Sequence, residues 1–233
     1  MCGIAGIFSP NKKIPEIEKL IVKSIDTLQH RGPDSRSSWC DKSRSVAFAH
    51  SRLSIIDLST TGNQPMKSQN GRYTITYNGE IYNYRQIKTE LKRKGYSFIG
   101  SSDTEVICCS IQEWGLVKSI EKFDGMFAIG TYDRIKNEVS IVRDWQGEKP
   151  LYYSTANESL CFASELKALT TFLHTSIRSN SVAEFLDYGF IKAPNTIYNE
   201  INQLRPGEIL QFGQERIKKS RLKHNLQAIH KPL

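Results

Sequence analysis

Residues 1–8 read MCGIAGIF, a continuous run of small and apolar side chains directly behind a cysteine. Such a run is typical of a buried strand. From Pro15 onward the pattern becomes helical, with apolar side chains at Ile14, Ile17, Leu20, Ile21, Ile25 and Leu28. The chain is therefore predicted to begin with a strand and then a helix.

Further along, the same two periodicities predict a mixed set of elements. Strands are expected at 46–49, 73–77, 127–132, 138–142, 151–153 and 160–163, and helices at 83–94, 165–172 and 181–188. Ser102 and Glu105 have the S-x-x-E spacing of a capping box, which predicts another helix that ends at Gly115. Because strands and helices do not alternate regularly, we expect two packed sheets with helices outside them.

Composition limits the classes of protein. The 233 residues, 39% of them hydrophobic, suffice for one large domain. A net charge of +8 would suit an anion, but Lys and Arg are spread along the chain except for one run near the end, so no nucleic acid partner is expected.

The cysteines and the apolar stretches point to a compartment. The five cysteines show no C-x-x-C spacing and no matching histidine pair, so we expect neither a metal site nor a full disulfide set, and a reducing, cytoplasmic setting. No apolar stretch approaches the ~20 residues that span a bilayer, and the N-terminus lacks the charge order of a secretory signal. No membrane partner is expected.

Cys2 can become the first residue, because an initiator Met is removed most easily before a small side chain. Its α-amine, with a pKa of ~7.7–8.0, would then lie beside its own thiol and could serve as the base. The position alone also fits a small apolar residue at the start of a strand. Both interpretations stay open on this evidence.

A second motif is YNGEIYNY at 77–84, directly after a predicted strand. The amide of Asn78 and the backbone N–H of Gly79 could form an oxyanion hole, although Asn-Gly is also the strongest short signal for a hairpin turn. Glu80 could receive the ammonium group of an amino acid.

Two further segments could complete an amino-acid pocket. Arg52, in HSRLSIID at 50–57, could grip a carboxylate, and Asp103, in SSDTEVI at 101–107, could hold an ammonium. Taken singly, Arg52 is typical of a surface charge and Asp103 of a helix cap. Read together with Cys2 and Glu80, they indicate a binding site.

Nine segments in one order resemble a known family. They are MCGIAGIF (1–8), HRGPD (30–34), RLSIID (52–57), GNQP (62–65), NGEIYNY (78–84), SDTEVI (102–107), DGMFAI (124–129), KPLYY (149–153) and FASELKAL (162–169). The chain resembles the glutaminase domain of asparagine synthetases, a class II glutamine amidotransferase. The resemblance implies an α+β fold, a four-layer αββα sandwich of the N-terminal nucleophile hydrolase type.

The resemblance also implies roles. Cys2 would attack L-glutamine to form a glutamyl thioester, with Asn78 and Gly79 as the oxyanion hole, and release glutamate and ammonia. The residues implied to bind glutamine are Arg52, Leu53, Ser54, Ile55, Ile56, Asn78, Gly79, Glu80 and Asp103. Of these, Arg52 would hold the carboxylate, and Glu80 and Asp103 the ammonium.

The match departs from the family at two places. Residues 143–147 read RDWQG, where the family usually has RDR-x-G, so Trp145 and Gln146 are unusual. The glutaminase domain is expected at 1–212, and 213–233 would be a basic tail where the family has a linker to an ATP-dependent synthetase domain. No cofactor is expected on this chain, and ATP and Mg²⁺ only on such a partner domain, with asparagine made from aspartate as the family product.

Two alternatives remain from the sequence. One is a glutamine-binding module whose catalysis is impaired by the changed RDWQG segment. The other is a Cys–His hydrolase that uses His30 or His50 as its base.

Overall fold

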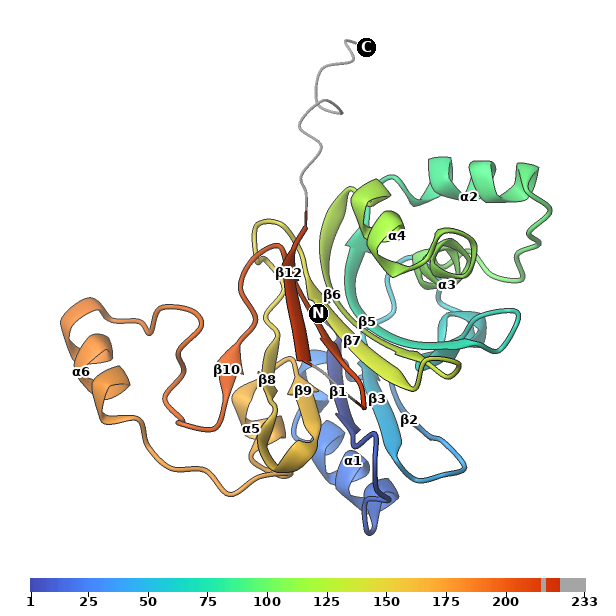
Figure 1. Ribbon diagram of the computed structural model, residues 1–233. Helices are drawn as coiled ribbons and strands as arrows, with labels where there is room; N and C mark the ends of the chain where they lie inside the picture. The colour runs from blue at the N-terminus through green and yellow to red at the C-terminus, as the bar shows by residue number, and fades with distance from the viewer. Residues whose placement is uncertain (215–216, 223–233) are drawn as a thin grey trace.

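The fold consists of four layers. The computed structural model describes residues 1–214 and 217–222. Two antiparallel sheets face each other, α1 and α5 lie on the outer face of one, and α2, α3 and α4 cover the outer face of the other (Figure 1). The predicted αββα sandwich is confirmed.

The first sheet carries the N-terminal strand at its centre. Its strand order is β10-β8-β9-β1-β3-β2, and every pairing is antiparallel. In that order the strands are Asn202–Gln203, Tyr152–Ser154, Leu160–Ala163, Gly3–Phe8, Val46–Arg52 and Ser35–Cys40.

The second sheet has the order β12-β11-β7-β6-β5-β4, again antiparallel throughout. Its strands are Ile217–Arg221, Glu208–Phe212, Glu138–Arg143, Gly125–Asp133, Tyr73–Ile81 and Met66–Lys67. Residues 217–221 of the expected basic tail thus form β12, the edge strand of this sheet.

The helices follow the expected positions with shifted ends. They are α1 Ile17–Asp26, α2 Tyr84–Arg93, α3 Asp103–Trp114, α4 Leu116–Lys122, α5 Leu166–Leu169 and α6 Ser179–Tyr188. Short 3-10 turns occur at η1 Gln29–Arg31, η2 Thr60–Gly62 and η3 Ala156–Glu158. Helix α6 projects away from the four layers (Figure 1).

Strand alternation divides the apolar side chains between layers. In β1, Ile4 and Phe8 join the core between the two sheets, whereas Ala5 and Ile7 face α1. Even-numbered side chains of β1 therefore point into the space between the sheets. By the same alternation, the side chain of Cys2 points into this space.

Two glycines let the sheets approach each other around one aromatic ring. A Cβ at Gly6 of β1 would lie 2.2 Å from the Phe162 ring, and one at Gly130 of β6 would lie 2.4 Å from it. Phe162 is fully buried in the core between the sheets. Any side chain at either glycine would push the sheets apart at this point.

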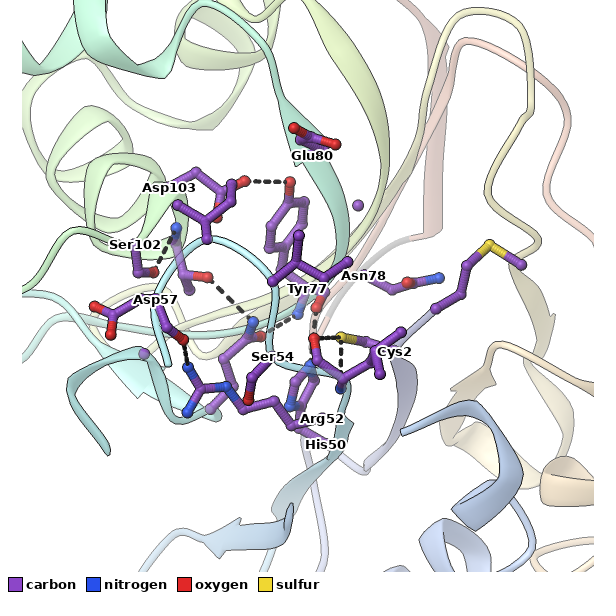
Figure 2. A pocket seen from close by; sticks show the side chains of 18 of the residues that line it. Cys2, His50, Arg52, Ser54, Asp57, Tyr77, Asn78, Glu80, Ser102 and Asp103 are labelled. Atoms are coloured by element: carbon purple, nitrogen blue, oxygen red, sulfur yellow. Dashed lines mark hydrogen bonds between the residues drawn. The ribbon is translucent and has the colours of Figure 1, made fainter. Parts of the chain in front are cut away.

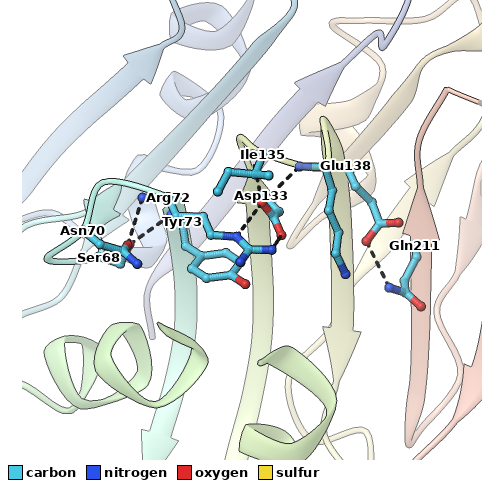
Figure 3. Close-up of polar contacts among 9 residues, drawn as sticks. Ser68, Asn70, Arg72, Tyr73, Asp133, Ile135, Glu138 and Gln211 are labelled. Carbon is cyan, nitrogen blue, oxygen red and sulfur yellow. Dashed lines mark hydrogen bonds and ion pairs between the residues drawn. The ribbon is translucent and has the colours of Figure 1, made fainter. Parts of the chain in front are cut away.

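Polar contacts tie the second sheet together at the Tyr73 end of β5 (Figure 3). Arg72 grips Asp133 with two hydrogen bonds, from Nε to Oδ1 at 3.0 Å and from Nη2 to Oδ2 at 2.7 Å. Gln211 Nε2 donates to Glu138 Oε1 at 3.0 Å. A bidentate pair of this kind is directional as well as strong, so it supports one register of β5 on β6.

The interpretation of Asn78-Gly79 as a turn is wrong. Strand β5 continues through both residues, because β6 extends far enough to pair Asn78 with Ala128 and Gly79 with Phe127. A Cβ at Gly79 would lie 2.1 Å from the carbonyl oxygen of Met126. Glycine is needed here for close approach of two strands and not for a reversal.

Two helix predictions need correction. Helix α5 ends at Leu169 instead of 172, since the hydroxyls of Thr170 and Thr171 take the carbonyls of Lys167 (2.9 Å) and Ala168 (2.7 Å). The capping box before α3 is half formed.

At that box, Ser102 Oγ accepts from Thr104 N at 3.0 Å as predicted. The Glu105 carboxylate, however, accepts from Ile99 N and Gly100 N, both at 2.9 Å. It therefore fixes the preceding loop rather than the cap residue.

Among the α-helices and strands of residues 1–214 and 217–222, six gave no clear signal in the sequence: β2, β4, α4, β10, β11 and β12. Over the described residues, none of the helices is both long enough and apolar enough to cross a bilayer.

Candidate active site

Cys2 lies just before β1, on the side that faces the second sheet. Its Sγ accepts from Leu53 N at 3.4 Å and donates to Leu53 O at 3.5 Å, so the residue that follows β3 holds the thiol. Burial raises the pKa of the Cys2 thiol, although the Leu53 contact and the nearby terminal ammonium oppose the shift. The thiol therefore needs a base before it can react as a thiolate.

Asn78 lies on the even-numbered side of β5, which faces the first sheet. Its side chain is only 1% exposed, and its Nδ2 finds no hydrogen-bond partner within residues 1–214 and 217–222. A buried amide with free donors is uncommon, because most buried polar atoms are paired. The amide is thus available to a ligand between the sheets.

All the predicted site residues line the same pocket, which Figure 2 shows from close by. They are Cys2, Arg52, Leu53, Ser54, Ile55, Ile56, Asn78, Gly79, Glu80 and Asp103. The cavity measures about 160 Å³, which is smaller than the ~300–1,000 Å³ pockets of drug-sized ligands and suits a small ligand.

Two carboxylates stand on one side of the pocket. Asp103 begins α3, and its Oδ2 accepts from Tyr77 OH at 2.8 Å and from Ile81 N at 3.2 Å (Figure 2). Burial raises the pKa of Asp103, although these hydrogen bonds lower it. Glu80, half-buried, extends from β5 on the same side.

Arg52 supplies the positive charge. It ends β3, and its guanidinium donates to Ser59 O at 2.7 Å, to Asn63 Oδ1 at 2.8 Å and to the carbonyl of Asp57. A guanidinium has five N–H donors. After these three contacts, two donors remain for a carboxylate in the pocket.

Neither histidine is placed as a base for Cys2. Among the described residues, the partners of Cys2 Sγ are the two backbone groups of Leu53. His30 is exposed and contacts Glu165 at 2.9 Å. His50 lines the pocket, but its Nε2 donates to Tyr77 O at 3.2 Å.

Burial and the charge of Arg52 lower the pKa of His50 to about 3, against the contact with Tyr77 O, which raises it. His50 is therefore neutral and a weak base. The geometry does not support the Cys–His alternative.

The unusual RDWQG segment lies outside the pocket lining. Arg143 and Asp144 organise it: Arg143 donates to the carbonyls of Lys149 (2.9 Å), Leu204 (2.7 Å) and Gly147 (2.6 Å). Trp145 packs on the core under α2 and α3. Neither Trp145 nor Gln146 lines the pocket.

Several pocket residues were given no role from sequence, among them Gln64 and Lys149. Gln64 accepts from Tyr77 N at 2.6 Å and donates to Thr104 Oγ1 at 3.1 Å, which ties β5 to the start of α3. Lys149 is 5% exposed, and its Nζ donates to Met1 Sδ at 3.3 Å. Gln64 belongs to the family segment GNQP and Lys149 to the family segment KPLYY. Membership of these segments was the sequence feature that could have indicated a role for both residues.

Within the described part of the chain, no cluster of three or more His, Cys, Asp or Glu side chains could hold an ion.

Two facing sheets between helix layers, with a cysteine at the second position against the pocket, define the fold class of the N-terminal nucleophile hydrolases. Within that class, the chain belongs to the glutamine amidotransferase domain family, whose model matches residues 1–223.

Curated relatives agree with this family. Asparagine synthetase [glutamine-hydrolyzing] 1 of Bacillus subtilis (strain 168) is 35% identical over 210 residues, which cover 89% of this chain and 33% of that protein. Asparagine synthetase B [glutamine-hydrolyzing] of Escherichia coli (strain K12) is 33% identical over 219 residues, 87% of this chain and 39% of that protein. The chain thus spans about a third of the length of these relatives.

A solved structure shares the fold. The glutamine phosphoribosylpyrophosphate amidotransferase from B. subtilis, complexed with ADP and GMP, superposes with a TM-score of 0.70 at 23% identity, covering 96% of this chain and 50% of that one.

Proposed function

We propose that this chain hydrolyses L-glutamine to glutamate and ammonia. The observation that carries the proposal is the buried Asn78 amide, whose Nδ2 has no partner within the described residues and which lines the same pocket as Cys2. An unpaired donor beside a nucleophile is the arrangement that a developing oxyanion requires. Membership of the family supports glutamine as the substrate.

The chemistry begins with loss of Met1, which leaves Cys2 with a free α-amine. This amine takes the thiol proton, and Sγ attacks the side-chain amide carbon of glutamine. The tetrahedral oxyanion accepts hydrogen bonds from Asn78 Nδ2 and Gly79 N. Collapse expels ammonia, which receives the proton from the amine, and leaves a glutamyl thioester that water hydrolyses to glutamate.

Charged side chains of the pocket bind the α-carboxylate and the α-ammonium of glutamine. Arg52 offers its two remaining N–H groups to the carboxylate, and Glu80 and Asp103 receive the ammonium. Charge-assisted hydrogen bonds of this kind contribute ~1.5–3 kcal/mol each. The backbone of residues 53–56 forms the wall beside Cys2.

Ammonia is passed to an ATP-dependent synthetase domain, where ATP and Mg²⁺ activate a carboxylate. The names of the relatives support asparagine as the product, and we propose aspartate as the acceptor of the ammonia. We propose a cytoplasmic setting for both reactions.

The test is glutamate release from glutamine by the purified chain, after intact mass has confirmed that Met1 is absent. We expect turnover, no turnover for Cys2→Ala, and none for a chain extended by one residue before Cys2. Full activity with a blocked N-terminus would overturn the role of the α-amine.

The oxyanion role has its own test. Asn78→Ala should lower kcat by ~10²–10³-fold, since one oxyanion donor is lost, while Arg52→Ala should mainly raise KM. An unchanged rate for Asn78→Ala would contradict the assignment.

A further inference from the structure

A network of polar contacts, made by residues that do not line the pocket, holds the backbone of Cys2. Arg31 ends η1, and its Nε donates to Cys2 O at 2.9 Å. Its Nη1 donates to Glu165 Oε1 at 3.0 Å. Neither Arg31 nor Glu165 lines the pocket, so both act on Cys2 from outside the substrate site.

Ser164, the residue before Glu165, holds Ile4 of β1. Ser164 is fully buried; its Oγ accepts from Ile4 N at 3.0 Å, and its N donates to Ile4 O at 3.0 Å. The regular pairing of β1 with β9 ends at Ala5 and Ala163, and the Ser164 contacts extend it by one residue to Ile4. Ser164 therefore holds Ile4 of β1 directly, and Glu165 holds Cys2, which precedes β1, through Arg31.

The Arg31 guanidinium depends on few contacts. Its Nη2 is buried and has no hydrogen-bond partner among the described residues. Its placement rests on the Cys2 carbonyl on one side and the Glu165 carboxylate on the other. Removal of the carboxylate charge would turn one of these two anchors into a weaker hydrogen bond to a neutral acceptor.

Glu165 also contacts two exposed basic side chains, His30 at 2.9 Å and Lys167 at 3.4 Å. Burial would raise the pKa of Glu165, but the hydrogen bonds from Arg31 and His30 keep it below its ordinary value. The carboxylate is thus ionised when it holds Arg31.

Cys2 needs such an anchor. It precedes β1, so the register of β1 with β3 begins only at Gly3. Once Met1 is removed, Cys2 is the chain end, and chain ends fray unless they are tied down. A nucleophile displaced by ~1 Å can lose ~10²-fold in rate.

We infer that Glu165 is a positioning residue for this site: through Arg31 it fixes the Cys2 carbonyl and thereby the direction of the thiol and the α-amine. The inference rests on the proposed glutaminase function. It requires that Glu165 affect the chemical step far more than the binding of glutamine.

The experiment compares Glu165→Gln with Lys167→Met in the chain that has lost Met1. Gln keeps the size of Glu165 and removes its charge, whereas Lys167→Met removes an exposed cation that touches the same carboxylate. We expect Glu165→Gln to lower kcat by ~10-fold or more with KM within ~2-fold. For Lys167→Met, both constants should stay within ~2-fold of wild type.

A double-mutant cycle tests the route through Arg31. In an Arg31→Met background, Glu165→Gln should lower kcat by no more than ~2-fold further, because the intermediary is already lost. The same loss in both backgrounds, an unchanged kcat, or a change confined to KM would overturn the inference. If Glu165→Gln does not fold, Glu165→Asp, which withdraws the charge by one methylene, replaces it with a smaller expected loss in kcat.

A second readout does not depend on turnover. The Gly3 amide belongs to the peptide group whose carbonyl Arg31 holds, so its ¹⁵N order parameter should fall in Glu165→Gln and not in Lys167→Met, from the ~0.85 of rigid backbone. An unchanged order parameter would refute the positioning role. Absence of glutamate release from wild type, with the order parameter shifted as expected, would instead refute the proposed function alone.

Discussion

Arg52 and Gly62 share one small space. A Cβ at Gly62 would lie 2.4 Å from Arg52 Nη2, and the guanidinium has little freedom because Ser59, Asn63 and Asp57 already hold it. The absence of a side chain at Gly62 therefore leaves room for the Arg52 guanidinium, which we propose binds the carboxylate of glutamine.

The prediction for this residue is that Gly62→Ala raises KM for glutamine by ~10-fold, since part of a charge-assisted hydrogen bond of ~1.5–3 kcal/mol is lost, with a smaller effect on kcat. The matched control is Gly213→Ala, where the nearest atom to a new Cβ is 3.8 Å away. Steady-state kinetics of glutamate release give both constants. An unchanged KM would show that Arg52 does not bind substrate.

His50 should make stability depend on pH. Its pKa is lowered to about 3, chiefly by burial, whereas an unfolded histidine titrates near ~6.5. Between these values the unfolded chain binds a proton that the folded chain does not. The free energy of unfolding therefore falls as the pH falls from ~6.5 toward 3.

His50→Gln should remove this component, because Gln has no proton to gain and its amide nitrogen stands near the place of the imidazole Nε2 that donates to Tyr77 O. Urea denaturation at several pH values between 4 and 7 measures it. His174→Asn, at an exposed position, is the control and should keep the slope of wild type. Equal slopes for all three proteins would contradict the assignment.

At the scale of elements, the helices differ in what they bury. In α1, Ile17, Ile21 and Ile25 are buried against the first sheet. Helix α6 buries only Ser181, while Phe185, Leu186 and Tyr188 are 53%, 77% and 70% exposed. Apolar content alone did not distinguish these two helices.

We therefore expect Phe185→Ser to change the free energy of unfolding by about 0.5 kcal/mol or less. Ile21→Ala should cost ~2–5 kcal/mol, since it leaves a cavity under a packed helix. Urea midpoints of the two variants against wild type give the comparison. A large loss for Phe185→Ser would mean that α6 contributes to the packed core.

At the scale of the whole molecule, the proposed reaction is half of an amide synthesis. A carboxylate must be activated before ammonia can form an amide with it, and ammonia alone supplies no driving force. The 233 residues contain no G-x-x-x-x-G-K-[ST] loop that would cradle ATP phosphates.

The chain by itself should therefore release glutamate from glutamine without making an amide. Incubation with glutamine, aspartate, ATP and Mg²⁺, followed by mass spectrometry, should show glutamate and neither asparagine nor AMP. Appearance of both asparagine and AMP from the purified chain would refute this prediction.

The sequence alone was sufficient for several features. Local periodicity placed four of the six α-helices in the described part of the chain close to their observed bounds, because the buried side chains of a helix recur every three or four residues. It also located the β1, β3, β6, β7, β8 and β9 segments. The ordered family strings brought together every residue of the predicted site, and all of them line the pocket.

Tertiary structure decided what local patterns cannot encode. Asn78-Gly79 reads as a turn until β6 is present to pair with it, and Gly79 is explained only by the Met126 carbonyl that it approaches. Likewise β12, edge strand of the second sheet, depends on β11, since a polar segment becomes a strand when a neighbour offers its hydrogen bonds.

The state of each site residue was also decided in three dimensions. The unpaired Asn78 amide, the neutral His50 and the hold of Glu165 on Cys2 through Arg31 all arise from segments far apart in the chain. Sequence determined which chemical groups the chain carries and which of them lie on one face of an element. Packing of the two sheets determined which of those groups meet, because burial and hydrogen-bond partners are properties of the assembled layers.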